Sequence, residues 1–385
     1  MLFSFKFWQR YTGWLFMALF SSCVDPFEPE VINSPDSLLV VNGFINSKGT
    51  TTITLLRTQN LTDLTAPTPE ENAQIFLEEE NGSRTPLMAT GNGNYTVYSN
   101  DLNPDKRYRI HLYTAANKEY ASEYVNVSQT PAIDAITWKT QGNELQIYAN
   151  THNAEDQTRY YRWQYEETWE FTSAYQTSLV YKNNEVTLRN DDIYHCWKTE
   201  PSTQIILGNT LRLSQNIVSE QPITAVPASS PKLGRKYSIL LKQFAQTPAE
   251  YQYWEALKKN TESIGTLFDP LPTQLTGNIK CITNANEPVI GYIGAYSVEE
   301  KRIFISKKEL PENWKTITGY EHCTPLDTVD NNPEDVAAQF GSEGSIPVSE
   351  LLSQRGPGVI GYLYSTKACI DCRVRGTNIR PAFWE

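Results

Sequence analysis

The chain has 385 residues, which is more than one hydrophobic core usually organises, so we expect two or three domains. Phe, Trp and Tyr make up 12% of the residues, a proportion that favours β-sheet faces and a binding surface. The formal net charge of −11 repels phosphate groups. It therefore excludes nucleic-acid binding and disfavours contact with anionic lipid.

The first 22 residues have the pattern of a secretory signal peptide. Lys6 and Arg10 form a basic leader, and the apolar run over 11–20 is too short to span a bilayer. Small residues, Ser21 and Ser22, follow at the expected cleavage point. Removal of residues 1–22 takes away two cations and no acid, which gives a mature net charge of −13.

Cys23 stands directly after this segment and is the predicted lipidation site. Leu19-Phe20-Ser21-Ser22-Cys23 resembles the lipobox of bacterial lipoproteins, although Phe20 occupies a position where Leu is usual. The resemblance implies a diacylglycerol thioether on Cys23, whose acyl chains contribute about 0.8 kcal/mol for each buried CH₂. The alternative is a secreted protein in which Cys23 is an ordinary thiol. Residues 23–36 are acidic and proline-containing, and we expect a short, stiff tether.

Residues 37–130 are predicted to form a β-sandwich domain, because seven short alternating segments are separated by turn residues. The segments are 38–44, 51–56, 73–79, 85–89, 94–98, 107–113 and 119–125. The later part, with Gly93-Asn94-Tyr95, Leu102 and Tyr108-Arg109-Ile110, resembles transthyretin-like and carboxypeptidase-regulatory-like modules, which commonly serve as spacers or docking platforms. We therefore expect an Ig-like or transthyretin-like sandwich.

Residues 131–385 are predicted to form a larger β-rich domain with one clear helix at about 248–264. Thr247-Pro248-Ala249-Glu250 has the pattern of a capping box with proline at the first helical position. Strands are expected at 236–244, 289–296 and 301–306, whereas 307–350 is expected to be mainly loop. The fold class is therefore mainly β.

Aromatic residues on odd positions of 161–171 have the period of a strand with one buried face. Two interpretations remain open. The pattern favours a sandwich core, and the alternative is a platform on which a ligand stacks. Trp163, Trp169 and Trp197 are the candidate ligand-binding residues under that alternative.

Five cysteines remain besides Cys23, and in an oxidising compartment we expect two disulfides and one spare thiol. The candidates are Cys196, Cys281, Cys323, Cys369 and Cys372. Their pairing is open. Zinc bound by His195-Cys196, His322-Cys323 and the Cys369/Cys372 pair is one alternative. A redox-active Cys369/Cys372 pair is another.

No catalytic residue is predicted. The chain has no Gly-x-Ser-x-Gly elbow and only four histidines, of which His111 is placed in a strand and His152 in a turn. Asp330 to Asp335 lacks the glycine of a calcium loop, so we expect a solvated acidic loop. We therefore predict no metal site and no cofactor.

An ordered set of motifs resembles domain-of-unknown-function family 4249. The motifs are Val41-Asn42-Gly43-Phe44-Ile45, Tyr194-His195-Cys196-Trp197, Lys236-Tyr237-Ser238-Ile239, Tyr251 to Thr261, Phe268-Asp269-Pro270, Leu275 to Cys281, Pro288 to Tyr292 and the final Cys-x-Asp-Cys. The resemblance implies a Bacteroidota outer-membrane lipoprotein whose gene often lies beside that of a TonB-dependent receptor. It brings no established catalytic residue.

These observations favour a non-enzymatic lipoprotein anchored in the outer membrane and facing outward. We expect it to capture a ligand for a TonB-dependent transporter, or to gate that transporter. A structural or adhesive envelope protein is the first alternative. The second is a hydrolase, which would need a cleft with converging acids or a histidine–acid pair.

Overall fold

A computed structural model of the chain describes residues 37–384 with five gaps, at 60–64, 100, 156–157, 263–274 and 276. The predicted signal peptide, Cys23 and the tether lie outside the described residues. The chain from Leu38 onward forms one compact unit. In the described part, no helix is both long and apolar enough to cross a bilayer.

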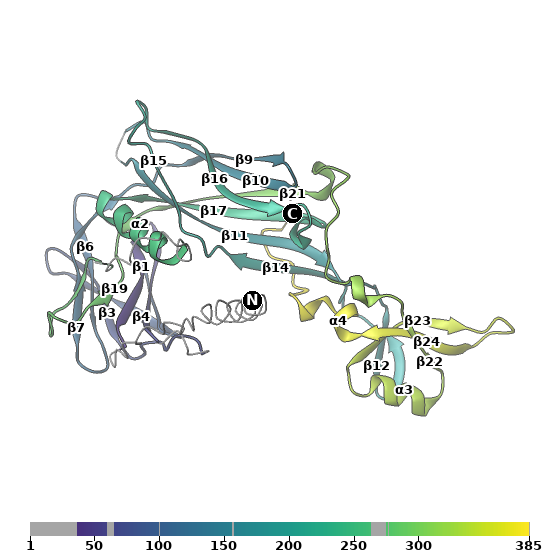
Figure 1. Ribbon diagram of the computed structural model, residues 1–385. Coiled ribbons are helices and arrows are strands. Elements are labelled where there is room, and N and C mark those ends of the chain that lie inside the picture. The colour runs from purple at the N-terminus through teal and green to yellow at the C-terminus, as the bar shows by residue number, and fades with distance from the viewer. Residues whose placement is uncertain are drawn as a thin grey trace, which may run out of the picture. The chain divides into compact units, whose positions relative to one another are not determined.

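The first sheet has eleven strands, and eight of them come from the predicted sandwich region (Figure 1). These are Leu39–Asn46 (β1), Gly49–Arg57 (β2), Gln74–Glu79 (β3), Arg84–Gly91 (β4), Asn94–Ser99 (β5), Arg107–Tyr113 (β6), Glu119–Ser122 (β7) and Val125–Ser128 (β8). Alternate side chains of β1, β2 and β6 enter a common core, which includes Leu39, Ile53 and Ile110. The predicted mainly β fold is confirmed.

Three short strands from a later part of the chain complete this first sheet. Ile279–Cys281 (β18) pairs with β7, while Val289–Ile290 (β19) and Ala295–Tyr296 (β20) pair in parallel with β1. We had placed 289–296 in the C-terminal domain, and this placement was wrong. Strands of two or three residues are too short to show an alternation of apolar and polar residues. They pair where β1 and β7 have free edges, which the sequence does not reveal.

A second sandwich follows, with its core between a three-stranded and a five-stranded sheet. The first of these sheets contains Ile133–Gln141 (β9), Glu144–His152 (β10) and Ile217–Pro227 (β16). The second contains Tyr160–Thr172 (β11), His195–Pro201 (β14), Ile206–Asn209 (β15), Lys236–Gln246 (β17) and Val298–Ser306 (β21). Tyr161, Trp163 and Tyr237 from the larger sheet are fully buried in this core.

The predicted helix is present as Pro248–Glu262 (α2), and Thr247 caps it by accepting a hydrogen bond from the Glu250 N–H at 3.2 Å. The second half of the predicted capping box is wrong. The Glu250 carboxylate contacts Tyr296, Gln246 and Trp254 in the protein interior instead of the backbone.

The remaining elements belong to smaller sheets and short helices. They are Leu179–Lys182 (β12), Glu185–Leu188 (β13), Asp327–Asp330 (β22), Ser345–Leu352 (β23), Val359–Thr366 (β24), Pro333–Phe340 (α3), Lys367–Ile370 (α4), Pro231–Leu233 (η2), Lys307–Glu309 (η3), Glu321–Cys323 (η4) and Cys372–Val374 (η5).

The prediction that 307–350 is mainly loop was therefore wrong, as was the acidic loop at Asp330 to Asp335. Helix α3 begins there, because Asn332 accepts the Glu334 N–H at 3.1 Å and Pro333 occupies the first helical position.

Candidate functional site: an aromatic pocket

Two disulfides join the C-terminal segment to the rest of the second half of the chain. Cys196 bonds Cys372 and Cys323 bonds Cys369, with Cα–Cα distances of 5.8 and 5.7 Å, while Cys281 is a buried free thiol. These distances are in the usual range for a disulfide. The predicted two disulfides and one spare thiol are confirmed, and the pairing that the sequence left open is now assigned.

The two cysteines of the Cys-x-Asp-Cys motif have different partners, because the chain turns between them. Cys369 lies in α4 and Cys372 begins η5, and the Cys372 N–H donates to the Ile193 carbonyl at 2.9 Å. The structure therefore does not contain the redox pair that we considered. All four sulfurs of the zinc alternative are likewise bonded to one another in disulfides.

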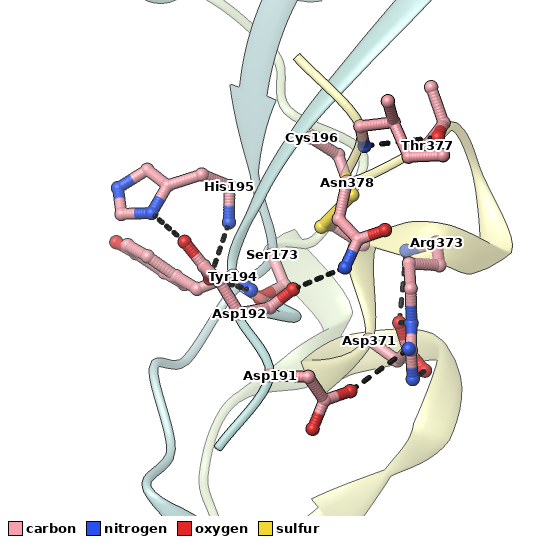
Figure 2. The surroundings of a disulfide bond; sticks show 12 residues. Ser173, Asp191, Asp192, Tyr194, His195, Cys196, Asp371, Arg373, Thr377 and Asn378 are labelled. Atoms are coloured by element: carbon pink, nitrogen blue, oxygen red, sulfur yellow. Dashed lines mark hydrogen bonds and ion pairs between the residues drawn. A yellow bond between two sulfur atoms is a disulfide. The ribbon is translucent and has the colours of Figure 1, made fainter. Parts of the chain in front are cut away.

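The segment after Cys372 is held against β14 by a ladder of polar contacts (Figure 2). Trp197 and Thr377 exchange two backbone hydrogen bonds of 2.8 and 2.9 Å, and the Asn378 side chain donates to the Asp192 carbonyl at 2.8 Å. Gly376 permits this approach, since a Cβ there would lie 2.5 Å from the Trp197 carbonyl oxygen. The C-terminal segment is thus a fixed wall of the second sandwich.

A pocket of about 590 Å³ lies between the larger sheet of the second sandwich and this wall. We call it the aromatic pocket, and its lining residues are Trp169, Glu170, Phe171, Thr172, Lys198, Pro231, Gly234, Arg235, Thr316, Thr318, Tyr320, Val374 and Arg375. They come from β11, β14, the η2 region, the loop before η4, the end of η5 and the residue after it.

Each disulfide lies close in sequence to one member of a stacked pair in this pocket. The Arg375 guanidinium lies 3.9 Å from the centroid of the Tyr320 ring. Arg375 follows Cys372 by three residues, and Tyr320 precedes Cys323 by three residues. The disulfides therefore hold both partners of the pair in register.

Gly319 makes room for the arginine. Its φ of +77° favours glycine, and a Cβ at this position would lie 2.8 Å from a terminal nitrogen of Arg375. That arginine donates hydrogen bonds to the carbonyls of Thr318 at 3.2 Å and Gly319 at 2.7 Å. The loop before η4 is thus shaped around the guanidinium.

Three cations around the pocket each have a carboxylate partner. The pairs are Lys232 with Glu167 at 2.6 Å, Lys198 with Glu200 at 2.8 Å and Arg235 with Glu170 at 2.9 Å. Arg375 is different: no carboxylate of the described residues forms an ion pair with it. The Glu321 carboxylate lies in the same loop as Tyr320, but it accepts hydrogen bonds from the Thr318 N–H at 2.7 Å and the Thr318 hydroxyl at 3.0 Å.

The Tyr320 hydroxyl is buried and has no hydrogen-bond partner among the described residues. The residue as a whole is 6% exposed, and burial raises the pKa of its hydroxyl. An unpartnered buried hydroxyl costs about 1–3 kcal/mol. A phenylalanine at this position would provide the same ring without an unpartnered hydroxyl, so packing alone does not explain the tyrosine.

The structure separates the three tryptophans that the sequence proposed for ligand binding. Trp163 is fully buried and donates from Nε1 to Gln243 at 2.9 Å, so it is a core residue and not a stacking surface. Trp197 is half-buried and packs on Trp384, with ring centroids 6.5 Å apart. Only Trp169 lines the aromatic pocket.

Three of the four histidines form pairs with acids, and none of them lines the aromatic pocket. The pairs are His111 with Glu78 (2.8 Å) and Glu119 (2.7 Å), His152 with Asp134 (2.8 Å) and His195 with Asp192 (2.8 Å). His111 lies in a strand as expected, whereas His152 ends β10 and is not in a turn.

The pair next to the first disulfide, His195 with Asp192, is drawn in Figure 2. Burial alone would raise the pKa of Asp192, but hydrogen bonds from His195 and the Tyr194 N–H lower it. Ser173 lies nearby, but its hydroxyl donates to the Tyr175 carbonyl at 3.1 Å. The arrangement is a local brace and not a catalytic triad.

A buried charge cluster at the start of α2 was missed by the sequence analysis. Glu250 is 1% exposed, and burial raises the pKa of its carboxyl to about 7, although nearby Arg162 lowers it. The Arg162 guanidinium lies between the rings of Phe244 and Trp254, at 4.3 and 4.4 Å from their centroids. The cluster joins α2 to β11, β17 and β20.

The profile of the family described as Domain of unknown function (DUF4249) matches residues 24–302, which is more than half of the chain. The chain belongs to the DUF4249 family. The resemblance predicted from the ordered motifs is therefore confirmed. The DUF4249 match ends before the loop of Thr316 to Tyr320 and before Arg375, so two walls of the aromatic pocket lie beyond it.

The other comparisons add little to this assignment. A comparison with curated proteins found no match. Among solved structures, the chicken interferon gamma receptor alpha chain is 10% identical, with 55% of this chain and 90% of that chain covered and a TM-score of 0.14. A putative carbohydrate binding protein from Bacteroides uniformis is 8% identical, with the same coverage and a TM-score of 0.13. At these scores neither likeness supports a structural or functional inference.

Proposed function

We propose that this DUF4249 protein is a non-enzymatic lipoprotein that captures a small ligand for a TonB-dependent transporter. A lipid on Cys23 holds it in the outer membrane, where it faces outward. It uses no cofactor. The family assignment and the lipobox-like sequence before Cys23 support the location, and the aromatic pocket supports the capture role.

The aromatic pocket is the observation that carries this proposal. Its volume of about 590 Å³ is within the range of about 300–1,000 Å³ that is usual for small-molecule sites. Its walls are also preorganised, because two disulfides fix the segments that carry Tyr320 and Arg375. A rigid site loses less conformational entropy when it binds, which favours capture at low ligand concentration.

The positions of the histidine–acid pairs support a non-enzymatic role. A hydrolase needs such a pair beside the bound substrate, with a nucleophile or a water within hydrogen-bond reach. Here His195 and Asp192 brace the chain near a disulfide, and His111 is buried between two carboxylates of the first sandwich. No histidine lines the aromatic pocket.

A lipid tether explains how a modest contact with a transporter suffices. Confinement to the membrane surface raises the effective concentration of the protein near its partner, so a weak interface stays occupied. The tether must supply this confinement by itself, because a mature net charge of −13 gives no attraction to anionic lipid.

Affinity purification of the full chain from host membranes in mild detergent tests the proposal. We expect a TonB-dependent receptor to co-purify with the wild-type protein and to be lost with the Cys23→Ala variant. Recovery of structural envelope proteins with no transporter, in repeated preparations, would instead favour the adhesive alternative and contradict the proposal.

A further inference from the structure

One cation of the aromatic pocket, Arg375, has no ion-pair partner among the described residues. Lys232, Lys198 and Arg235 each lie within 3 Å of a carboxylate oxygen, and Arg375 forms no such pair among the described residues. An arginine cannot lose its proton in a protein, so this charge persists at every physiological pH. A guanidinium with unused donors and no ion-pair partner is suited to receive an anionic group from outside the protein.

The orientation of Arg375 leaves part of its guanidinium available. It has five N–H donors, and the structure shows two hydrogen bonds, to the carbonyls of Thr318 and Gly319. The Tyr320 ring covers one face of the group. The remaining N–H donors lie in the guanidinium plane, where the planar fork matches the two oxygens of a carboxylate.

The rest of the pocket suits an apolar body attached to that anionic group. Phe171 and Val374 contribute apolar surface, and Trp169, which is 5% exposed, also lines the pocket. Tyr320 also lines the pocket, and its buried hydroxyl has no partner in the described part of the chain. These groups combine one fixed charge with apolar walls.

We propose that the aromatic pocket binds a small molecule that carries a carboxylate on an apolar body, and that Arg375 receives the carboxylate. This inference rests on the proposed capture function, whose site it specifies. A neutral ligand would leave Arg375 without a counter-charge, and a cationic one would be repelled. The pocket therefore selects for acids.

Three probes that share one ring and differ in the head group test this proposal by calorimetric titration. They are phenylacetate, its neutral isostere phenylacetamide, and phenylmethanesulfonate. The full chain in mild detergent is the protein used, with each titration corrected by a detergent blank. We expect phenylacetate to bind at least about tenfold more tightly than phenylacetamide, because a charge-assisted hydrogen bond replaces a neutral one.

Arg375→Gln is expected to remove this preference, and Arg375→Lys, which keeps the charge but not the planar fork, to retain only part of it. Arg355→Gln is the matched control, since Arg355 is exposed and does not line the pocket. Near-ultraviolet circular dichroism of each variant verifies that the pocket region is folded.

Equal binding of phenylacetate and phenylacetamide, no binding of phenylacetate, or an equal loss of preference in Arg355→Gln would overturn the proposal. Tighter binding of the sulfonate than of the carboxylate would identify the anion as a sulfur oxyacid and overturn the carboxylate assignment. These titrations contain no transporter, so their outcome is independent of the co-purification experiment.

Discussion

At the scale of single residues, side chains in the second half of the chain have roles that their neighbours in sequence do not reveal. Glu250 has the sequence context of a helix cap, yet its carboxylate is turned into the interior beside Arg162 and Tyr296. Arg375 stands in a basic run near the C-terminus, yet it stacks on Tyr320. Local sequence patterns predict hydrogen bonds between near neighbours well. They do not predict contacts with residues that are distant in the sequence.

Glu250 makes a specific prediction about pH and stability. Its pKa is about 7 in the folded protein and about 4.5 in the unfolded chain. When folding raises the pKa of a carboxyl, its contribution to stability is fully present below the pKa of the unfolded chain. This contribution is lost as pH rises toward the pKa of the folded protein, because the unfolded chain releases its proton first. Its contribution should fall by about 3 kcal/mol between pH 4.5 and pH 7.

Urea denaturation of the wild-type protein and of Glu250→Gln across this pH range measures the effect. Other acids titrate in both proteins and cancel in the difference between them. The free energy of unfolding of the wild type, relative to the variant, should therefore decrease as pH rises. A difference that stays constant from pH 4.5 to pH 7 would show that Glu250 does not titrate there.

At the scale of elements, the sequence predicted the strands with a clear alternation of apolar residues and the helix with a clear capping residue. Six of the seven predicted strands between 38 and 125 match single observed strands within two residues, and the last is divided into β7 and β8. The start of α2 was found from Thr247 and Pro248. Strand β18 was not predicted, and the run that contains β19 and β20 was placed in the wrong domain, because two or three residues carry no measurable period.

Helix α3 was missed although a signal for it exists. Asn332-Pro333-Glu334-Asp335 places a capping residue, a proline at the first helical position and two acids in the first turn. We interpreted the same acids as a solvated loop. The general lesson from this segment is that a run of acids needs to be tested as a helix start before it is assigned to a loop.

The two disulfides lead to a prediction about relative stability. Cys196–Cys372 closes a segment of 176 residues and Cys323–Cys369 one of 46 residues. Each disulfide stabilises the folded protein by about 2–5 kcal/mol. Loop-closure entropy grows with the length of the closed segment, so the bond that closes the longer segment should stabilise the protein more. Paired Cys→Ser variants, measured by urea denaturation, should therefore lose more stability for the first bond. The opposite order would show that the segment after Cys372 is held mainly by its non-covalent contacts.

At the scale of the whole molecule, the candidate site could not have been predicted, although one of its residues was. Trp169 was proposed from its strand, but its neighbours in the pocket come from 231–235, 316–320 and 374–375. Segment 231–235 reaches Trp169 through the pairing of β17 with β11. Segments 316–320 and 374–375 lie beside the cysteines that pair as Cys196 with Cys372 and Cys323 with Cys369, and sequence alone left that pairing open. Trp163, the other tryptophan of the same strand, fills the core instead.

The proposed role depends on whether the protein is anchored in the outer membrane. The proposed capture for a transporter needs both a ligand in the aromatic pocket and a membrane anchor at Cys23. Without that anchor, the effective concentration at the membrane disappears, and a weak contact with a transporter would no longer be occupied.

Mass spectrometry of the N-terminal peptide, from protein extracted from host membranes, tests this claim most directly. We predict a mature chain that begins at Cys23 and carries the mass of a diacylglycerol thioether. An unmodified peptide, from material recovered entirely in the aqueous phase, would contradict the lipid anchor and the transporter role that depends on it.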